Sequence, residues 1–278
     1  MLRKLILFSL LSFSASQCYS QEKKYEYVDV PENNKSEPGK HYTKIDVNKI
    51  RFGAMVAPTI TWMHPTTSTS DDGKYKVSSD GSKMGYMWGL MAEYYFASNY
   101  ALVSGFEVNS QGGKINTYST ADIGPSNPTN TVISTHFDYR LQYIEIPVAL
   151  KLISDELPKN GARIYGQVGL TLGINISRIA TYNVVYFDEN GVSQTTSGNN
   201  QKLTGTLAVP PAMLQLNVGL GVEYPIASKL MFYTGLFFNN GFLPDATNPK
   251  NYTLGYKGSF SDGNTRLNNF ALRLGLFF

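Results

Sequence analysis

Three histidines and their nearby carboxylates are the residues best suited to acid–base chemistry in this 278-residue chain. A histidine beside a carboxylate can activate water. His64 and His136 lie near Asp71, Asp72 and Asp138 in sequence, whereas His41 lies in a polar stretch. A hydrolytic site using His64 or His136 is therefore one alternative.

Other signatures of catalysis are absent from the sequence. We find no G-x-S-x-G, no H-E-x-x-H, no clustered Cys and His, and no phosphate-binding glycine loop. We therefore predict that the protein is not an enzyme and uses no cofactor or metal. The two histidines are expected to form hydrogen bonds at a rim.

A second group of charged residues occurs where alternating strands would place them on one face. Five acids and five bases make up this group: Arg51, Glu93, Glu107, Asp138, Arg140, Glu145, Lys151, Arg163, Glu223 and Arg273. Unpaired charges in a confined interior cost several kcal/mol each, and matched signs offset much of this cost. The pattern predicts a structural ion-pair network that fills a polar lumen. A proton or ion pathway is the alternative.

In the segments that carry these residues, apolar side chains recur at every second position, which is typical of β-strands with one apolar face. Eight such segments are predicted, at about 50–63, 84–96, 100–111, 136–152, 163–178, 213–224, 230–239 and 268–278. In the fourth segment we predict that Tyr139, Leu141 and Tyr143 face outward. The alternation then slips by one residue at Tyr143–Ile144, which indicates a bulge there.

The last segment carries its apolar residues at every second position, namely Phe270, Leu272, Leu274, Leu276 and Phe278. An unpaired final strand would invite aggregation, and pairing it with the first strand closes a barrel. A terminal aromatic residue on an alternating strand resembles the C-terminal signal of bacterial outer-membrane barrels. We expect these five residues to act as an insertion signal for the barrel-assembly machinery.

The connections alternate between short and long, which is the topology of an outer-membrane barrel with short periplasmic turns and long outer loops. Residues 97–99, 154–162 and 227–229 are short, whereas 64–83, 112–135, 179–212 and 242–265 are long and polar. Within the third long loop, 183–187 and 192–196 flank Asp188-Glu189-Asn190-Gly191 and predict a hairpin. The predicted fold is an all-β, eight-stranded antiparallel transmembrane barrel. A soluble β-sandwich is the rival.

The segment Tyr143-Ile144-Glu145-Ile146-Pro147, followed by Val148-Ala149-Leu150-Lys151, resembles a motif of the PorT-type outer-membrane barrel family. The resemblance implies a signal peptide, an eight-stranded barrel and a terminal Phe. The family's namesake is associated with type IX protein secretion. An accessory subunit of a secretion or assembly machine is therefore a further alternative, by resemblance only.

The N-terminus predicts export. Arg3 and Lys4 precede a short apolar run, so residues 1–20 read as a signal peptide, with Gln21 as the first mature residue. Acylation of Cys18 is the alternative. Residues 21–45 form a polar extension, and residues 46–278 form the barrel. Without Arg3 and Lys4 the net charge of +3 becomes +1, which argues against nucleic acid as a partner.

These observations predict a non-enzymatic barrel in the outer membrane of a Gram-negative bacterium. Its lumen would be plugged, and it would act through its outer loops or an envelope protein partner. Outer-membrane lipid and the barrel-assembly machinery are its other expected partners. The accessory subunit, the outer-rim hydrolase and a narrow channel stay open as alternatives.

Overall fold

The computed structural model describes residues 50–66, 68–69, 73, 75–120, 132–158, 161–202, 209–227, 230–242, 246–247 and 264–278. The predicted signal peptide, the extension at 21–45 and most of the loop at 242–265 lie outside these ranges. Within them, no helix has the length and apolar character needed to cross a membrane.

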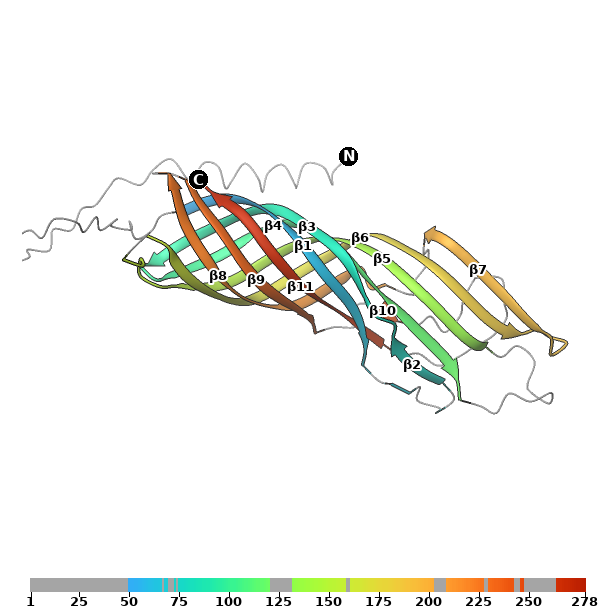
Figure 1. Ribbon diagram of the computed structural model, residues 1–278. Helices are drawn as coiled ribbons and strands as arrows, with labels where there is room; N and C mark the ends of the chain where they lie inside the picture. The colour runs from blue at the N-terminus through green and yellow to red at the C-terminus, as the bar shows by residue number, and fades with distance from the viewer. Residues whose placement is uncertain are drawn as a thin grey trace, which may run out of the picture. The chain divides into compact units, whose positions relative to one another are not determined.

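Eight long strands form a closed antiparallel ring (Figure 1). In ring order they are β1 (Ile50–Pro65), β3 (Ser82–Ala97), β4 (Tyr100–Ser119), β5 (Val132–Ile153), β6 (Arg163–Phe187), β8 (Ala212–Ala227), β9 (Leu230–Gly241) and β11 (Asn264–Phe277). The ring closes where β1 pairs with β11, from Gly53 opposite Phe277 to Pro65 opposite Thr265. The predicted all-β, eight-stranded antiparallel barrel is confirmed.

Three short strands lie outside the ring: β2 (Tyr75–Ser79), β7 (Ser193–Lys202) and β10 (Ala246–Thr247). They belong to the end of the barrel with the long connections. There β4 leaves β3 after Ser110 and pairs with β2, and β6 leaves β8 after Ile174 and pairs with β7. The far parts of β4, β5 and β6, with β2 and β7, thus continue beyond the ring as an outer sheet (Figure 1). The predicted hairpin in 183–196 is confirmed as the β6–β7 pair.

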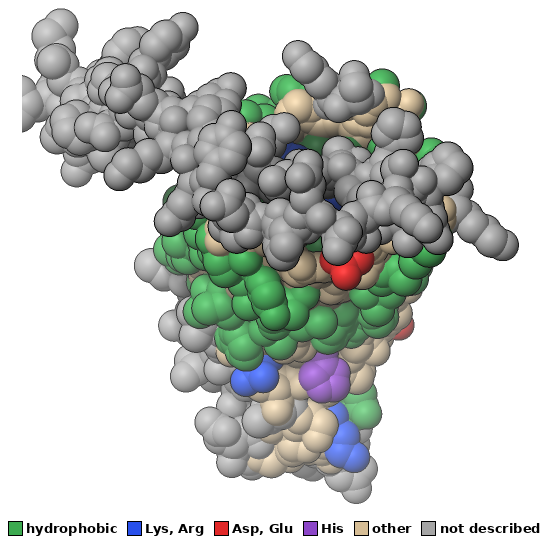
Figure 2. Space-filling model, turned by 90° about the vertical axis from the view of Figure 1, so that its left-hand side faces the viewer, with side chains coloured by type: hydrophobic (Ala, Val, Ile, Leu, Met, Phe, Trp, Pro, Cys, Tyr) green, Lys and Arg blue, Asp and Glu red, His purple; other side chains and the backbone are tan. Residues whose placement is uncertain are grey.

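The barrel wall has an apolar outer face because large hydrophobic side chains alternate with residues directed inward. On β1 and β11, for example, Phe52, Val56, Phe270 and Leu272 are exposed, while Met55 and Arg273, at the alternate positions, are buried. In Figure 2 the hydrophobic side chains on the face shown form a band, with Lys, Arg and His side chains beyond one edge. Such a band is the surface that a bilayer covers.

The outward placement of Tyr139, Leu141 and Tyr143 was wrong. All three are buried, and every odd-numbered residue of β5 from Thr135 to Ile153 points inward without a slip. The extra residue lies on the neighbouring strand instead. Gln142 is opposite Ser177 and Tyr143 is opposite Asn175, so Ile176 is the bulged residue of β6.

Candidate functional site

The interior near the short turns holds two acids and two bases in one cluster. Lys151 on β5 lies between Glu93 on β3 and Glu223 on β8, and its Nζ is 2.5 Å from Glu93 Oε1 and in contact with Glu223 Oε1. Arg51 on β1 contacts both carboxylates, at 2.5 Å from Glu93 and 3.0 Å from Glu223. The four charges balance, which offsets the cost of burying them.

Aromatic rings lie against the cations of this cluster. Lys151 Nζ is 4.4 Å from the ring centroid of Tyr165 and 5.1 Å from that of Phe277. The Arg51 guanidinium lies 4.7 Å from the Tyr95 ring and 4.8 Å from the Phe277 ring. Cations over ring faces at these distances are attracted by the ring quadrupole. The layer is therefore both packed and charge-compensated.

A second ion pair lies further along the barrel axis. Arg273 on β11 meets Glu107 on β4 with two parallel contacts, Nη1 to Oε1 at 3.0 Å and Nη2 to Oε2 at 3.1 Å. The guanidinium carbon is 4.4 Å from the ring centroid of Phe237. The side chains of Arg273 and Glu107 are 2% and 0% exposed. This bidentate geometry makes the pair a strong, fully desolvated one.

Amide side chains form a directional chain around the interior, which we call the amide belt. Each NH2 group donates to the next carbonyl: Gln167 to Asn217 at 3.1 Å, Asn217 to Asn239 at 2.5 Å, Asn239 to Asn269 at 2.7 Å, and Asn269 to Gln111 at 3.0 Å. Gln111 then donates to Glu145 Oε1 at 3.4 Å, and Asn109 donates to the same oxygen at 2.9 Å. All these amide dipoles therefore run toward one carboxylate.

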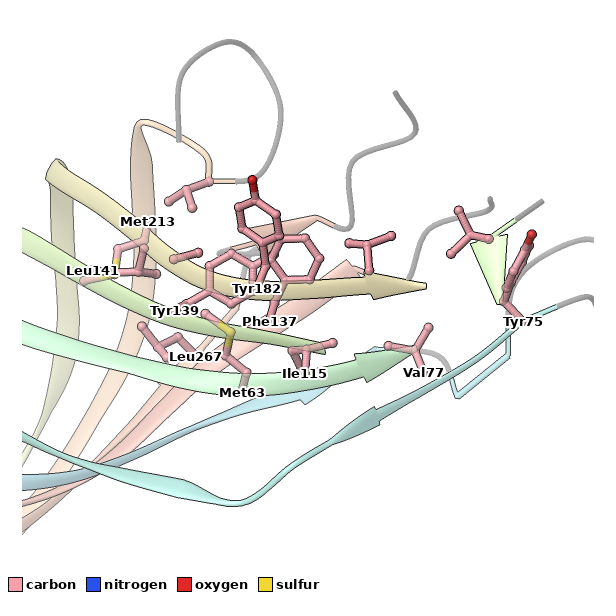
Figure 3. Packing of buried hydrophobic residues seen from close by; sticks show 14 of the residues in the cluster. Met63, Tyr75, Val77, Ile115, Phe137, Tyr139, Leu141, Tyr182, Met213 and Leu267 are labelled. Carbon is pink, nitrogen blue, oxygen red and sulfur yellow. The ribbon is translucent and has the colours of Figure 1, made fainter. Parts of the chain in front are cut away.

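An apolar cluster occupies the interior at the loop end (Figure 3). Phe137 stacks on Tyr139 and on Tyr182, each with ring centroids 5.6 Å apart. Met63 and Met213 pack in the same cluster, and none of its members is more than 8% exposed. The lumen thus changes from ion pairs through amides to hydrophobic side chains along its length.

The ten predicted lumen charges do not all lie in the lumen. Arg51, Glu93, Glu107, Glu145, Lys151, Glu223 and Arg273 do, and Arg163 is buried near the short turns, 2.8 Å from Glu156. The predicted lumen positions of Asp138 and Arg140 were wrong. Because β5 keeps its alternation, Asp138 points outward and contacts Lys83, and Arg140 is exposed.

The amide belt was not predicted from the sequence. A signal was present, because Gln167, Asn217, Asn239 and Asn269 each occupy an inward position of their strand. Their hydrogen-bonded order around the ring depends on strand register, which the sequence alone does not provide.

The two histidines among the described residues, His64 and His136, lie on the outer surface of the loop end. His64 is exposed, and His136 Nδ1 is 2.6 Å from Asn116 Oδ1 and 3.4 Å from Asp80 Oδ2. Asp71 and Asp72 lie outside the described residues. Among the described residues, no group of three His, Cys, Asp or Glu could hold a metal ion.

At the turn of the β6–β7 hairpin, Asp188 organises the backbone. Its Oδ1 accepts the N–H groups of Val192 at 2.9 Å and Asn190 at 2.8 Å, and its Oδ2 accepts from Gln194 at 3.1 Å. These hydrogen bonds, the one from Val192 above all, lower the pKa of the Asp188 carboxyl.

Comparison with known proteins agrees with this architecture. A family model described as outer membrane protein beta-barrel domain matches residues 33–239. No curated protein matches the chain.

Among the solved structures that are similar to it are three whose own chains are covered almost completely. They are Neisserial surface protein A (13% identity, TM-score 0.36, covering 82% of this chain and 97% of that chain), OprG from Pseudomonas aeruginosa (12%, 0.38, 84% and 98%) and Ail from Yersinia pestis (11%, 0.35, 84% and 99%).

Proposed function

Because the chain belongs to the outer membrane protein beta-barrel domain family and is a protein of the Gram-negative outer membrane, we propose that it is a closed, non-enzymatic barrel that presents its outer sheet to a protein partner. In such barrels the short turns face the periplasm and the long loops face outward. The outer sheet is then the part of the described chain that stands beyond the membrane.

The side chains packed along the lumen support this proposal. Eight strands enclose an interior just wide enough for side chains. Here the interior holds the Lys151 cluster, the Arg273–Glu107 pair, the amide belt and the apolar cluster in succession. An apolar layer at the outer end also disfavours a continuous file of water. We therefore expect negligible ion conductance.

Planar-bilayer recording of the refolded protein tests the closed lumen. The wild-type protein should give no reproducible channel openings. A Tyr165→Ala/Phe237→Ala variant removes two buried aromatic rings from the lumen. It serves as the positive control and should conduct. Stable openings from the wild-type monomer would refute the closed barrel and favour the narrow channel.

The outer sheet supports the second half of the proposal. All ten residues of β7 are exposed or half-exposed, and nine of them carry no charge. Among the strands that the structure describes, β7 pairs with β6 alone, so its other edge presents backbone groups outward. Edge strands without charge or proline accept an added strand readily. The partner that fits this edge is an extended, uncharged polypeptide segment.

Cross-linking in intact cells tests the role of this edge. A photoreactive residue at Thr195 should capture one discrete envelope protein. The Thr195→Lys/Ser197→Lys variant adds two charges to β7 and carries the photoreactive residue at a neighbouring position of the strand. It should capture less of the partner while the barrel still folds. Leu157→Lys, at the opposite end of the barrel and 40% exposed, is the matched control and should have no effect. Equal capture by both variants would contradict docking at β7.

The resemblance of residues 143–151 to the PorT-type family suggests the kind of protein that this partner is. We propose that the protein is an accessory subunit of a secretion or assembly machine of the envelope. Identification of the cross-linked protein as a component of such a machine would support this assignment, and a partner unrelated to secretion would remove it.

A further inference from the structure

Three aromatic rings cluster on the outer wall where the ring of strands closes. They are Phe238 on β9, Phe270 on β11 and Trp62 on β1, and these strands are consecutive around the ring. The ring centroids are 5.4 Å apart for Trp62 and Phe270, 5.0 Å for Phe270 and Phe238, and 6.3 Å for Trp62 and Phe238. Phe270 is exposed and the other two are half-buried. We call these three residues the seam aromatic patch.

The wall becomes polar directly beyond this patch, toward the long loops. Asn268 is opposite Trp62, and its Oδ1 accepts a hydrogen bond of 2.9 Å from Asn240 Nδ2. Two residues further along each strand, His64 and Arg266 are directly opposite each other, and both are exposed. The apolar surface of β1 and β11 therefore ends at the seam aromatic patch, and two basic side chains stand just past its edge.

The position of these basic residues matches the depth of lipid head groups. Aromatic side chains on a barrel wall gather at the interface between hydrocarbon and water. A strand rises about 3.4 Å per residue, so His64 lies about 7 Å beyond Trp62 along β1. For a strand tilted by about 40°, this is about 5 Å along the membrane normal. Because the head-group layer of one leaflet is roughly 5–8 Å thick, His64 and Arg266 lie at the level of the lipid phosphates.

The positive charge at this edge has no acidic partner among the residues that the structure describes. The Arg266 guanidinium is always charged, and its cross-strand neighbour His64 is either neutral or positive. Of the described acids at the loop end, Asp138 contacts Lys83 and Asp80 lies beside His136. Neither contacts His64 or Arg266. The seam therefore presents a guanidinium to the head-group layer, directly above three aromatic rings.

We propose that the seam between β1 and β11 is a binding site for a phosphorylated lipid of the outer leaflet. Arg266 and His64 bind the phosphate, since a guanidinium fork matches phosphate oxygens and an imidazole N–H can donate to them. The seam aromatic patch holds the first part of an acyl chain against its rings. The site uses the outward direction of the long loops given above, and it is independent of the closed lumen and of docking at β7.

Fluorescence of Trp62 measures which lipid occupies the seam. The chain has two tryptophans, Trp62 and Trp88, so Trp88→Phe leaves Trp62 as the sole reporter. This protein is refolded into phosphatidylcholine vesicles that contain increasing shares of brominated phosphatidic acid, a phosphate monoester, or of brominated phosphatidylcholine. Bromine quenches a ring that it contacts, so the two quenching curves give the relative affinity of the lipids. We expect phosphatidic acid to be preferred by about fivefold, the effect of one basic residue near an anionic lipid surface.

Arg266→Gln is the deciding variant, because it removes the charge from an exposed position and leaves the aromatic patch in place. It should abolish the preference for phosphatidic acid. Lys76→Gln, which removes an exposed base from β2 of the outer sheet, is the matched control and should keep the full preference. Heat-dependent gel mobility confirms that each variant is folded. If Arg266→Gln does not fold, His64→Gln is measured in its place and should reduce the preference.

Trp88 reports on the lipid elsewhere around the barrel. It is exposed on β3, opposite Val56, and in a Trp62→Phe protein the two brominated lipids should quench it equally. An equal preference at both tryptophans would overturn the proposal, because it would show general attraction of anionic lipid. So would equal quenching of Trp62 by both lipids, or a preference that survives in Arg266→Gln. Recovery of Trp62 fluorescence on addition of inorganic phosphate at constant ionic strength would show that the site takes free phosphate, and would overturn the lipid assignment. Conductance and cross-linking would be unaffected by these outcomes.

Discussion

Replacing Arg273 by methionine is expected to destabilise the barrel by about 3–5 kcal/mol, because it leaves the Glu107 carboxylate buried without its partner. Both side chains are almost fully buried, and they share two N–O contacts of 3.0 and 3.1 Å. Methionine can fill much of the volume beside Phe237, so loss of packing contributes little. The cost therefore reports mainly the stranded charge.

The double variant Arg273→Met/Glu107→Gln isolates the coupling between the two groups. Since the second change removes the stranded carboxylate, the double variant should be more stable than Arg273→Met alone. A double-mutant cycle should give a coupling energy on the order of 1–3 kcal/mol. Arg273→Lys keeps the charge but loses the bidentate contact, so its effect should be intermediate.

The Arg163–Glu156 pair provides the matched control. Its N–O distance is 2.8 Å, but the Glu156 side chain is 30% exposed. Water can solvate either group when its partner is lost, so Arg163→Met should cost about 1 kcal/mol or less. Urea unfolding of the protein in lipid vesicles, followed by heat-dependent gel mobility, measures all these variants. Equal costs for Arg273→Met and Arg163→Met would refute the argument from burial.

Three further results are expected. Leu272→Arg places a charge against hydrocarbon and should cost about 2–4 kcal/mol in the same unfolding assay; wild-type stability would mean that the outer face is misassigned. The pKa of Asp188, measured by NMR, should lie below its ordinary value. The stabilisation that the Asp188 carboxylate gives to the hairpin turn is therefore present at neutral pH and is lost as the pH falls through that lowered pKa. Loss of hydrogen-exchange protection of the Val192 amide only under strongly acidic conditions would agree with this, and loss near neutral pH would contradict it. His136→Ala removes a contact with Asp80 at the surface and should leave folding and cellular phenotype intact; loss of function with a folded barrel would revive the hydrolase.

The ring of strands was predictable because lipid imposes a strict alternation on every strand that it touches. The run from Phe270 to Phe278 shows this, since Phe270, Leu272, Leu276 and Phe278 are exposed and Arg273 is buried. The outer sheet was less predictable, because its strands contact water and need not be apolar outside. Strand β4 was expected to end near residue 111 and continues to Ser119.

Register and partner choice could not be derived from the sequence. The sequence did not indicate which lumen acid is the partner of Arg273, and in the structure it is Glu107. Tyr139 and Tyr143 were predicted to face outward, and aromatic residues are indeed common in membrane girdles. In β5 they instead fill the outer lumen, where a narrow barrel needs bulky side chains. The same residue types suit both environments, so composition could not separate them.

The bulge at Ile176 determines which residues of β6 face inward on each side of it. Before it, odd-numbered residues such as Thr171 point inward; after it, even-numbered residues such as Tyr182 do. Deletion of this one residue would remove the bulge and leave one regular alternation, with Thr171 and Tyr182 still pointing inward and the register with β5 continuous. The bulge is therefore the point at which the alternation of β6 in the membrane barrel is brought into phase with its alternation in the outer sheet.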